Sequence, residues 1–276
     1  MLDKFIYEDH HGRRFTGLEN GVYLNYNDLR DYSWSYETIN SRISRFYRPI
    51  TNRKIPLTVV CKSDEEAVFV RDRLLELAEA DIEAKLPGKI FIGDYYTLGY
   101  ITGSKKSNYL ISKRICSIEL TLTSDNPAWY REQKHVFGTS TSDEVTSASG
   151  ADYKYDYPYD YAVNMNGRRI VCNTLSDNAF KLAIYGPATD PTIIINGHEY
   201  GVTGSVGDGE VLRIDSLTKA ITLTTRAGVT LNWFDRRRRD FYIFEPIPPG
   251  QHVVSWFGEF GFDLTIIEKR SEPKWI

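Results

Sequence analysis

The residues from 178 to 256 contain several short runs of β-forming side chains, and this pattern constrains the fold more than any other feature. The runs are 178–185, 192–195, 198–202, 211–215, 220–224, 241–244 and 252–256. Turn-forming residues separate them, among them Gly186-Pro187, Gly207-Asp208-Gly209 and Asn196-Gly197. The last pair is favoured in tight hairpins because both of its residues tolerate positive φ. Short strands at this spacing predict an antiparallel β-sandwich or barrel.

The amino-terminal half combines strands with one helix. A strand at 55–61 would place Ile55, Leu57, Val59 and Cys61 on one face. Ser63, with an acidic residue three positions later, predicts the start of a helix through a capping box. Apolar residues then follow at helical spacing; they are Ala67, Val70, Leu74, Leu77 and Ala78. Further strands are predicted at 89–92, 95–101 and 114–123, so this half is an α+β module with a sandwich-like or barrel-like sheet.

A change of composition divides the chain into two predicted domains. Residues 138–151 are mostly small and polar, without periodicity, which indicates a linker. We therefore expect an α+β domain at 1–137 and a β-sandwich at 152–276. Tyrosine alternates with polar residues at 153–161, which predicts the first, edge strand of the sandwich. The fold class as a whole is mainly β.

Composition excludes several classes of protein. The chain has 276 residues, a net charge of −3 and a pI of about 6.0, whereas nucleic-acid-binding domains are usually basic. We therefore expect no sequence-specific nucleic acid partner. No apolar run approaches the ~18 residues of a membrane span, and the first residues lack the apolar core of a signal peptide. The three cysteines are odd in number and widely spaced, so we expect folding in a reducing cytoplasm without a disulfide framework.

The sequence contains no constellation typical of an enzyme or a metal protein. Glu245 and Glu259 lie near aromatic residues, but nothing in the pattern places them together as a glycosidase pair. No nucleophile elbow, phosphate-binding loop or zinc-binding helix motif is present. His10-His11, at a predicted hairpin turn, supplies too few ligands for a metal site. We therefore predict no enzyme activity, no metal and no cofactor.

The densest charge cluster is the run of four arginines between Asp235 and Asp240. Such a run is suited to binding phosphate or an anionic sugar. The flanking carboxylates reduce its net charge. This favours a solvated loop, or an edge strand whose charges discourage pairing with another chain. A salt bridge between subunits of a ring is a related possibility.

Three ordered blocks in the carboxy-terminal half resemble one known family. The blocks are FKLAIYGPATDPTIIINGHEY, GEVLRIDSLTKAIT and NWFDRRRRDFYIFEPIPPGQH. They are similar to the distal tail (Dit) proteins of siphophages, which are long-tailed phages, and a weaker resemblance extends over the amino-terminal half. The resemblance implies a galectin-like sandwich in the second domain. It also implies a structural virion protein, made in the bacterial host cytoplasm, whose hexameric ring joins the tail tube to the hub and receptor-binding proteins at the tail tip.

A carbohydrate-binding adhesion module that contacts host glycans is the main alternative function. Antiparallel sandwiches often bind glycans by stacking an aromatic ring on a sugar, and Trp233 and Trp256 are the candidates. The sequence around Trp256 is only superficially like the tryptophan block of galectins, and the His-x-Asn-x-Arg block is absent. Fold analogy alone does not carry function. Either tryptophan is more often a core residue than a sugar-stacking one.

The predicted subunit interface lies before the helix, between residues 32 and 48. Interfaces are enriched in aromatic residues and arginine at their centre, and this stretch supplies both; the residues are Tyr32, Trp34, Tyr36, Arg45, Phe46, Tyr47 and Arg48. We expect them to form a projecting hairpin that meets a different surface on the next copy of a ring. The competing interpretation, nearly as strong, is that these aromatics fill the core of their own domain.

Overall fold

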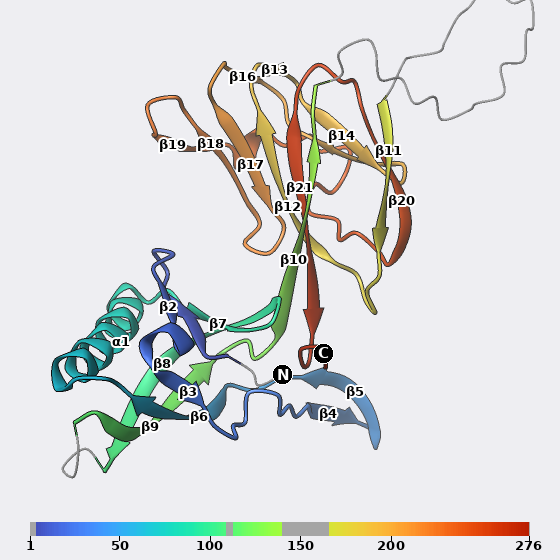
Figure 1. The fold of residues 1–276 in the computed structure, drawn as a ribbon. Helices are drawn as coiled ribbons and strands as arrows, with labels where there is room; N and C mark the ends of the chain where they lie inside the picture. Colours follow the sequence, from blue (N-terminus) through green and yellow to red (C-terminus); the bar gives the residue numbers. More distant parts are fainter. Residues whose placement is uncertain (1–3, 109–112, 140–165, 276) are drawn as a thin grey trace, which may run out of the picture. The chain divides into compact units, whose positions relative to one another are not determined.

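The computed structural model describes residues 4–108, 113–139 and 166–275 (Figure 1). The fold is mainly β, as predicted, and divides into two compact units. The first unit is Met1–Arg131 with Lys269–Ile276, and the second is Glu132–Glu268. These limits differ from the predicted domains, since the second unit begins before residue 137 and the last residues return to the first unit.

The first unit combines several short strands with three strands of ten or more residues and one helix of 21 residues. They are β1 (Ile6–Glu8), β2 (Arg14–Thr16), η1 (Leu18–Asn20), β3 (Val22–Leu24), β4 (Ser35–Ile39), β5 (Arg42–Tyr47), β6 (Thr51–Val60), α1 (Asp64–Ala84), β7 (Gly88–Ile92), β8 (Tyr95–Ser107) and β9 (Ile115–Ser124). β10 (Trp129–Phe137) leads the chain into the second unit, and β21 (Phe262–Arg270) leads it back.

The long strand β8 organises the sheet of the first unit. Its first half pairs with β7 and β10, and its second half pairs with β9, with a register shift between Ile101 and Gly103. The sheet continues from β7 through β1 to β2, and from β9 through β6 to β3, and all these pairs are antiparallel. The strands predicted at 55–61, 89–92, 95–101 and 114–123 are all present, and β8 pairs with different neighbours on the two sides of the register shift.

Helix α1 begins where the sequence predicts. The Ser63 hydroxyl accepts the backbone N–H of Glu66 at 3.1 Å, and the Glu66 carboxylate accepts the N–H of Lys62 at 2.7 Å. The predicted apolar positions of the helix are buried against a core that also contains Phe5, Tyr7 and Phe15. The helix ends with Lys85 in the left-handed region. No helix in the described part of the chain has the length and apolar character needed to cross a membrane.

The second unit is an antiparallel β-sandwich, as the short alternating runs predict. Its remaining elements are β11 (Asn166–Cys172), β12 (Ala179–Tyr185), β13 (Ala188–Thr189), β14 (Thr192–Ile195), β15 (His198–Gly201), β16 (Ser205–Val206), β17 (Val211–Asp215), β18 (Ala220–Thr224), β19 (Thr230–Asn232), η2 (Phe234–Arg236) and β20 (Gly250–Trp256). One sheet has the order β19-β18-β17-β12-β21 and the other β11-β20-β14-β15. Apolar residues from both sheets form a single core. Its likeness to galectins stays a prediction.

Two details of the second unit differ from the predictions. Residues 241–244 form no strand, because the run packs Ile243 and Phe244 into the core through an irregular segment near three prolines. Strand β11 has no counterpart among the predicted runs. The predicted edge strand at 153–161 and nearly all of the predicted linker at 138–151 lie outside the described residues.

Candidate functional site: the β4–β5 hairpin

Strands β4 and β5 form a hairpin that pairs with no other described strand. The turn between them uses Asn40 and Ser41 at φ 49° and 60°, the positive values that a tight right-twisting hairpin needs. A register shift follows Glu37, so that Ser44 is left between the paired residues. The Ser44 hydroxyl donates a hydrogen bond to the carbonyl of Glu37 at 3.1 Å. The sequence therefore specifies the hairpin locally, without support from a larger sheet.

The register places the side chains of the hairpin on two faces of different composition. Tyr36 pairs with Phe46, and Thr38 pairs with Ile43. Directly paired residues share a face, and alternate residues along a strand do so as well, so these four side chains lie together. The opposite face carries the Glu37–Arg45 pair and Arg42, with Ile39 and Tyr47. One face is thus largely apolar, and the other mixes charge with hydrophobic side chains.

Both faces are open to solvent in the single chain. Phe46 is 59% exposed, and Tyr36, Ile43 and Ile39 are exposed to a similar degree. Tyr32 and Tyr47 are also exposed. The interpretation that these aromatics fill the core of their own domain is therefore wrong, because none of them belongs to either buried cluster.

The base of the hairpin is attached to the carboxy-terminal tail of the same unit. The Arg48 guanidinium donates to the hydroxyl of Ser271 at 2.8 Å and to the carbonyl of Arg270 at 3.4 Å. Its central carbon lies 4.3 Å from the centre of the Trp34 ring, a cation–π distance. Burial lowers the pKa of Arg48 below its usual value. Arg30 stacks similarly on Trp275 of the tail at 4.2 Å, so the hairpin begins from a fixed base.

The structure separates the seven predicted interface residues into two groups. Trp34 and Arg48 contact each other at the base, and Arg48 is only partly exposed. The other five lie on the hairpin or just before it with their side chains exposed; they are Tyr32, Tyr36, Arg45, Phe46 and Tyr47. Sequence reasoning missed Ile39 and Ile43, which are exposed on the same hairpin. Extending the alternation through both strands would have found them.

An exposed two-stranded hairpin with an apolar face is an incomplete structure. Isolated two-stranded ribbons are marginally stable in water and usually need a third strand or a packing partner. Contiguous exposed apolar side chains on a soluble protein commonly mark an interaction surface. The β4–β5 hairpin has both properties, so it is the best candidate in the described chain for contact with another protein.

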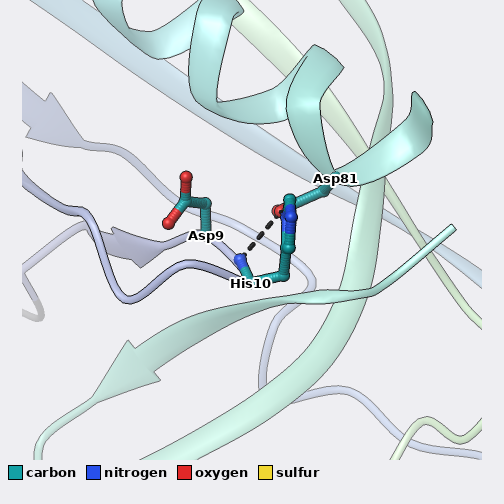
Figure 2. A group of neighbouring side chains, drawn as sticks. All are labelled: Asp9, His10 and Asp81. Atoms are coloured by element: carbon teal, nitrogen blue, oxygen red, sulfur yellow. Dashed lines mark hydrogen bonds and ion pairs between the residues drawn. The ribbon is translucent and has the colours of Figure 1, made fainter. Parts of the chain in front are cut away.

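A second cluster joins the β1–β2 turn to helix α1. Figure 2 shows Asp9 and His10, which follow β1, beside Asp81 of the helix. The Nδ1 of His10 lies 2.6 Å from Oδ1 of Asp81, and the His10 backbone N–H donates to the same oxygen at 2.8 Å. The Tyr7 hydroxyl donates to the other oxygen of Asp81. Asp9, His10 and Asp81 lie close enough together to hold a metal ion.

Each of these carboxylates already has protein donors. Asp9 accepts the backbone N–H groups of His11 and Arg13 on one oxygen and the Arg13 guanidinium on the other, at 2.6–3.1 Å. Burial alone would raise the pKa of Asp9, but the hydrogen bonds and charge of Arg13 outweigh it and leave that pKa lowered. Burial, followed by the bond to Asp81, raises the pKa of Tyr7. The cluster therefore fastens a hairpin to a helix, and metal binding would break these bonds.

The two tryptophans proposed for sugar stacking lie in different environments. Trp256 is 6% exposed and packs edge-on against Phe137 and Phe262 in the sandwich core. The prediction of Trp256 as a stacking residue is therefore wrong, because no sugar ring can reach the faces of its buried indole. Trp233 is partly buried against the same core and has the Arg236 guanidinium 5.8 Å from its ring centre. The structure supplies no pair of exposed aromatic platforms from these residues.

The arginine run lies in a mostly exposed loop, in agreement with the solvated loop that the charge pattern favours. Arg237 stacks on Phe234 at 4.0 Å and donates to the Phe234 carbonyl. Arg238 pairs with Glu199 at 3.2 Å. The loop borders a hollow of about 400 Å³ that is also lined by Lys219 and Phe241. Arg237 and Arg238 are thus held by contacts within the second unit.

Comparison with known proteins identifies the fold. No protein-family model and no curated protein sequence matches the chain. Among solved structures, the Dit protein (gp19.1) of phage SPP1 is 9% identical, with a TM-score of 0.57 and coverage of 98% of this chain and 100% of that one. Chains of the phage P2 baseplate in its activated conformation, with Ca or with Sr, are each 11% identical, with TM-scores of 0.64 and coverage of 99% and 100%. The SPP1 protein is called a paradigm of the hub adsorption apparatus in phages that infect Gram-positive bacteria. The chain described here has the fold of these phage proteins.

Proposed function

We propose that this chain is a structural phage tail protein that forms a ring at the distal end of the tail tube and connects the tube to the host-recognition hub. The observation that carries the proposal is the β4–β5 hairpin, which is complete only when another chain covers it. Similarity of fold along nearly the whole chain to phage Dit and baseplate proteins supports the tail assignment. The proposed role is structural rather than catalytic.

The ring requires a contact in which one surface meets a different surface of the next copy. The apolar face formed by Tyr36, Ile43 and Phe46 supplies one of these surfaces. Its fixed base, where Arg48 joins Trp34 and the tail, orients the hairpin for docking. A hexameric stoichiometry, with the tail-tube protein on one side and hub proteins on the other, completes the proposal.

The mass of the full-length protein in solution, together with negative-stain images, tests this function. We expect a closed ring with a central hole and a mass near six copies of the 31.8 kDa chain. Phe46→Ser should shift the protein to monomers, because it removes an exposed aromatic from the docking face. Phe257→Ser, which changes an exposed phenylalanine of the sandwich, is the matched control and should leave the ring intact.

Circular dichroism must show both variants folded for the comparison to count. A wild-type protein that stays monomeric at high micromolar concentration contradicts the ring. A Phe46→Ser protein that still forms rings contradicts the role of the hairpin.

A further inference from the structure

Arg53 of strand β6 is a buried cation that forms no ion pair with any residue that the structure describes. Its side chain is 3% exposed and lies in phase with Ile55 and Leu57 on the buried face of the strand. Nη2 donates to the backbone carbonyls of Asp31 and Pro127, at 3.4 and 3.3 Å. Nε and Nη1 are buried and have no hydrogen-bond partner in the described chain.

This environment is unfavourable for a guanidinium group. Arginine is almost never fully buried unless it is paired, because it keeps its charge and its five N–H donors under all ordinary conditions. Burial and then the positive charge of Arg48 lower the pKa of Arg53, and the exposed Asp31 opposes this only in part. The described groups around Arg53 therefore leave a buried positive charge that is not neutralised.

The polar groups nearest to this charge are themselves donors. Nε of Arg48 is buried and also has no partner in the described chain. The Tyr130 hydroxyl accepts the side-chain N–H of Asn126 at 2.7 Å, and its own hydrogen has no acceptor among the described residues. Burial raises the pKa of Tyr130 while the charge of Arg48 lowers it, which places that guanidinium near the hydroxyl. Several N–H and O–H groups thus meet without a matching acceptor.

Two of the cations in this region reach solvent. Arg48 is partly exposed, and Lys269 of strand β21 is exposed. Burial and then the charge of Arg48 lower the pKa of Lys269, so the ammonium group lies within the field of the same guanidinium. A small anion in solution can therefore approach past Lys269 and Arg48, and three positive charges attract it.

We infer that the base of the β4–β5 hairpin is a binding site for a small oxyanion such as phosphate, held between the guanidinium groups of Arg48 and Arg53 with the Tyr130 hydroxyl as a further donor. The planar guanidinium group presents its N–H donors in a geometry that matches the paired oxygens of an oxyanion. Arg48 follows β5 and Arg53 lies in β6, so the anion ties the base of the hairpin to the sheet. This inference does not depend on the proposed ring.

Calorimetric titration of the full-length protein with inorganic phosphate tests the site directly. We expect saturable binding at neutral pH that sodium chloride of the same ionic strength does not reproduce, and sulfate should compete with phosphate. Arg53→Met should abolish this binding, because it removes the charge and keeps an apolar side chain of similar length. Lys54→Met is the matched control, since it removes one charge from the exposed face of the same strand.

The control protein should bind phosphate as tightly as the wild type. Wild-type protein that shows no saturable binding beyond that of chloride would overturn the inference. An Arg53→Met protein with wild-type affinity would overturn it as well. Equal weakening by Arg53→Met and Lys54→Met would do the same, because it would reflect net charge rather than a built site.

Thermal unfolding supplies a second measurement. Phosphate should raise the unfolding midpoint of the wild type by roughly 2–4 °C relative to chloride, because it binds only the folded state. In chloride, Arg53→Met should be at least as stable as the wild type, since an apolar replacement relieves a buried unpaired charge. Phosphate should leave its midpoint unchanged. A midpoint of the wild type that does not respond to phosphate, together with a destabilised Arg53→Met protein, would show that Arg53 has a purely structural role.

Arg53→Lys keeps the charge but removes the unpartnered guanidinium N–H groups. It should bind phosphate about tenfold more weakly or worse, as expected when a charge-assisted hydrogen bond is lost. A lysine variant with wild-type affinity would overturn the inference even if the methionine variant did not fold.

Discussion

The hairpins β4–β5 and β14–β15 are similar in sequence pattern but differ in what covers them. Each has apolar side chains on its strands and a tight turn with positive φ, at Asn40-Ser41 and at Asn196-Gly197. The β14–β15 hairpin pairs with β20 and buries Ile193 completely in the sandwich core. The β4–β5 hairpin pairs with no further described strand and leaves its apolar face in solvent. Apolar strand residues thus predict a face that needs covering, but not whether the same chain covers it.

The largest expected effect is a loss of stability at the covered hairpin. Ile193→Ala should lower the free energy of unfolding of the sandwich by about 2–5 kcal/mol, because it removes buried methyl groups and leaves a cavity. Urea unfolding followed by fluorescence measures this change. Leu217→Ala, at an exposed position of the same unit, is the control and should change it by less than ~0.5 kcal/mol. Equal losses in the two variants would contradict the contrast between buried and exposed sites.

The β1–β2 hairpin is intermediate, because hydrogen bonds to Asp81 hold it on helix α1. Asp81→Ala should lower the free energy of unfolding of the first unit by about 1–3 kcal/mol, since it leaves the buried Tyr7 hydroxyl without its acceptor. Thermal unfolding detects the loss. Glu83→Ala, at an exposed position of the same helix, should have little effect. A stable Asp81→Ala protein would show that apolar packing alone holds this hairpin.

The turns of the two main hairpins respond differently to a change of residue. Gly197→Ala should destabilise the sandwich by about 1 kcal/mol, because an alanine at φ 84° is strained although no atom crowds its Cβ. Ser41→Gly at φ 60° relieves a similar strain but adds ~0.5–1 kcal/mol of unfolded-state entropy, so its net effect should be near zero. Unfolding curves of both variants test this. A large loss on Ser41→Gly would mean that the serine side chain itself supports the turn.

The pH dependence of the β1–β2 hairpin follows from Asp9. Its pKa is lowered in the folded chain by Arg13 despite burial, so the unfolded chain binds the proton more readily. The stabilisation is therefore present above the ordinary carboxyl pKa of about 4 and is lost as the pH falls through the lower folded value. Unfolding measured over the titration window, roughly between pH 5 and pH 2, should show this loss. Asp9→Asn should flatten the dependence, and an unchanged slope would exclude Asp9 as its source.

The smallest expected effect on stability belongs to the open hairpin. Phe46→Ser should change the free energy of unfolding of the isolated subunit by less than ~0.5 kcal/mol, because its ring already lies in solvent. The same substitution should abolish ring formation. A large loss of subunit stability would show that the hairpin packs on its own chain in solution.

Much of the fold follows from local sequence signals. The capping residues Ser63 and Glu66 place the start of α1, and alternation in residues 114–123 places Cys116, Ile118 and Leu120 in the core as found. The signals fail where tertiary packing overrides local pattern. Residues 241–244 look like a strand, but the core takes up Ile243 and Phe244 from an irregular segment.

For the candidate site, local sequence signals predict a hairpin rich in aromatics and arginine, because strand alternation and turn chemistry are local properties. Phe46 is exposed while Trp256 is buried, and the packing of the folded chain was needed to tell them apart, since both lie in similar aromatic runs. The folded chain also places Arg48 beside Ser271, which lies far away in the sequence. Burial depends on which distant segments pack together, and that information is spread over the whole chain rather than held in any one stretch.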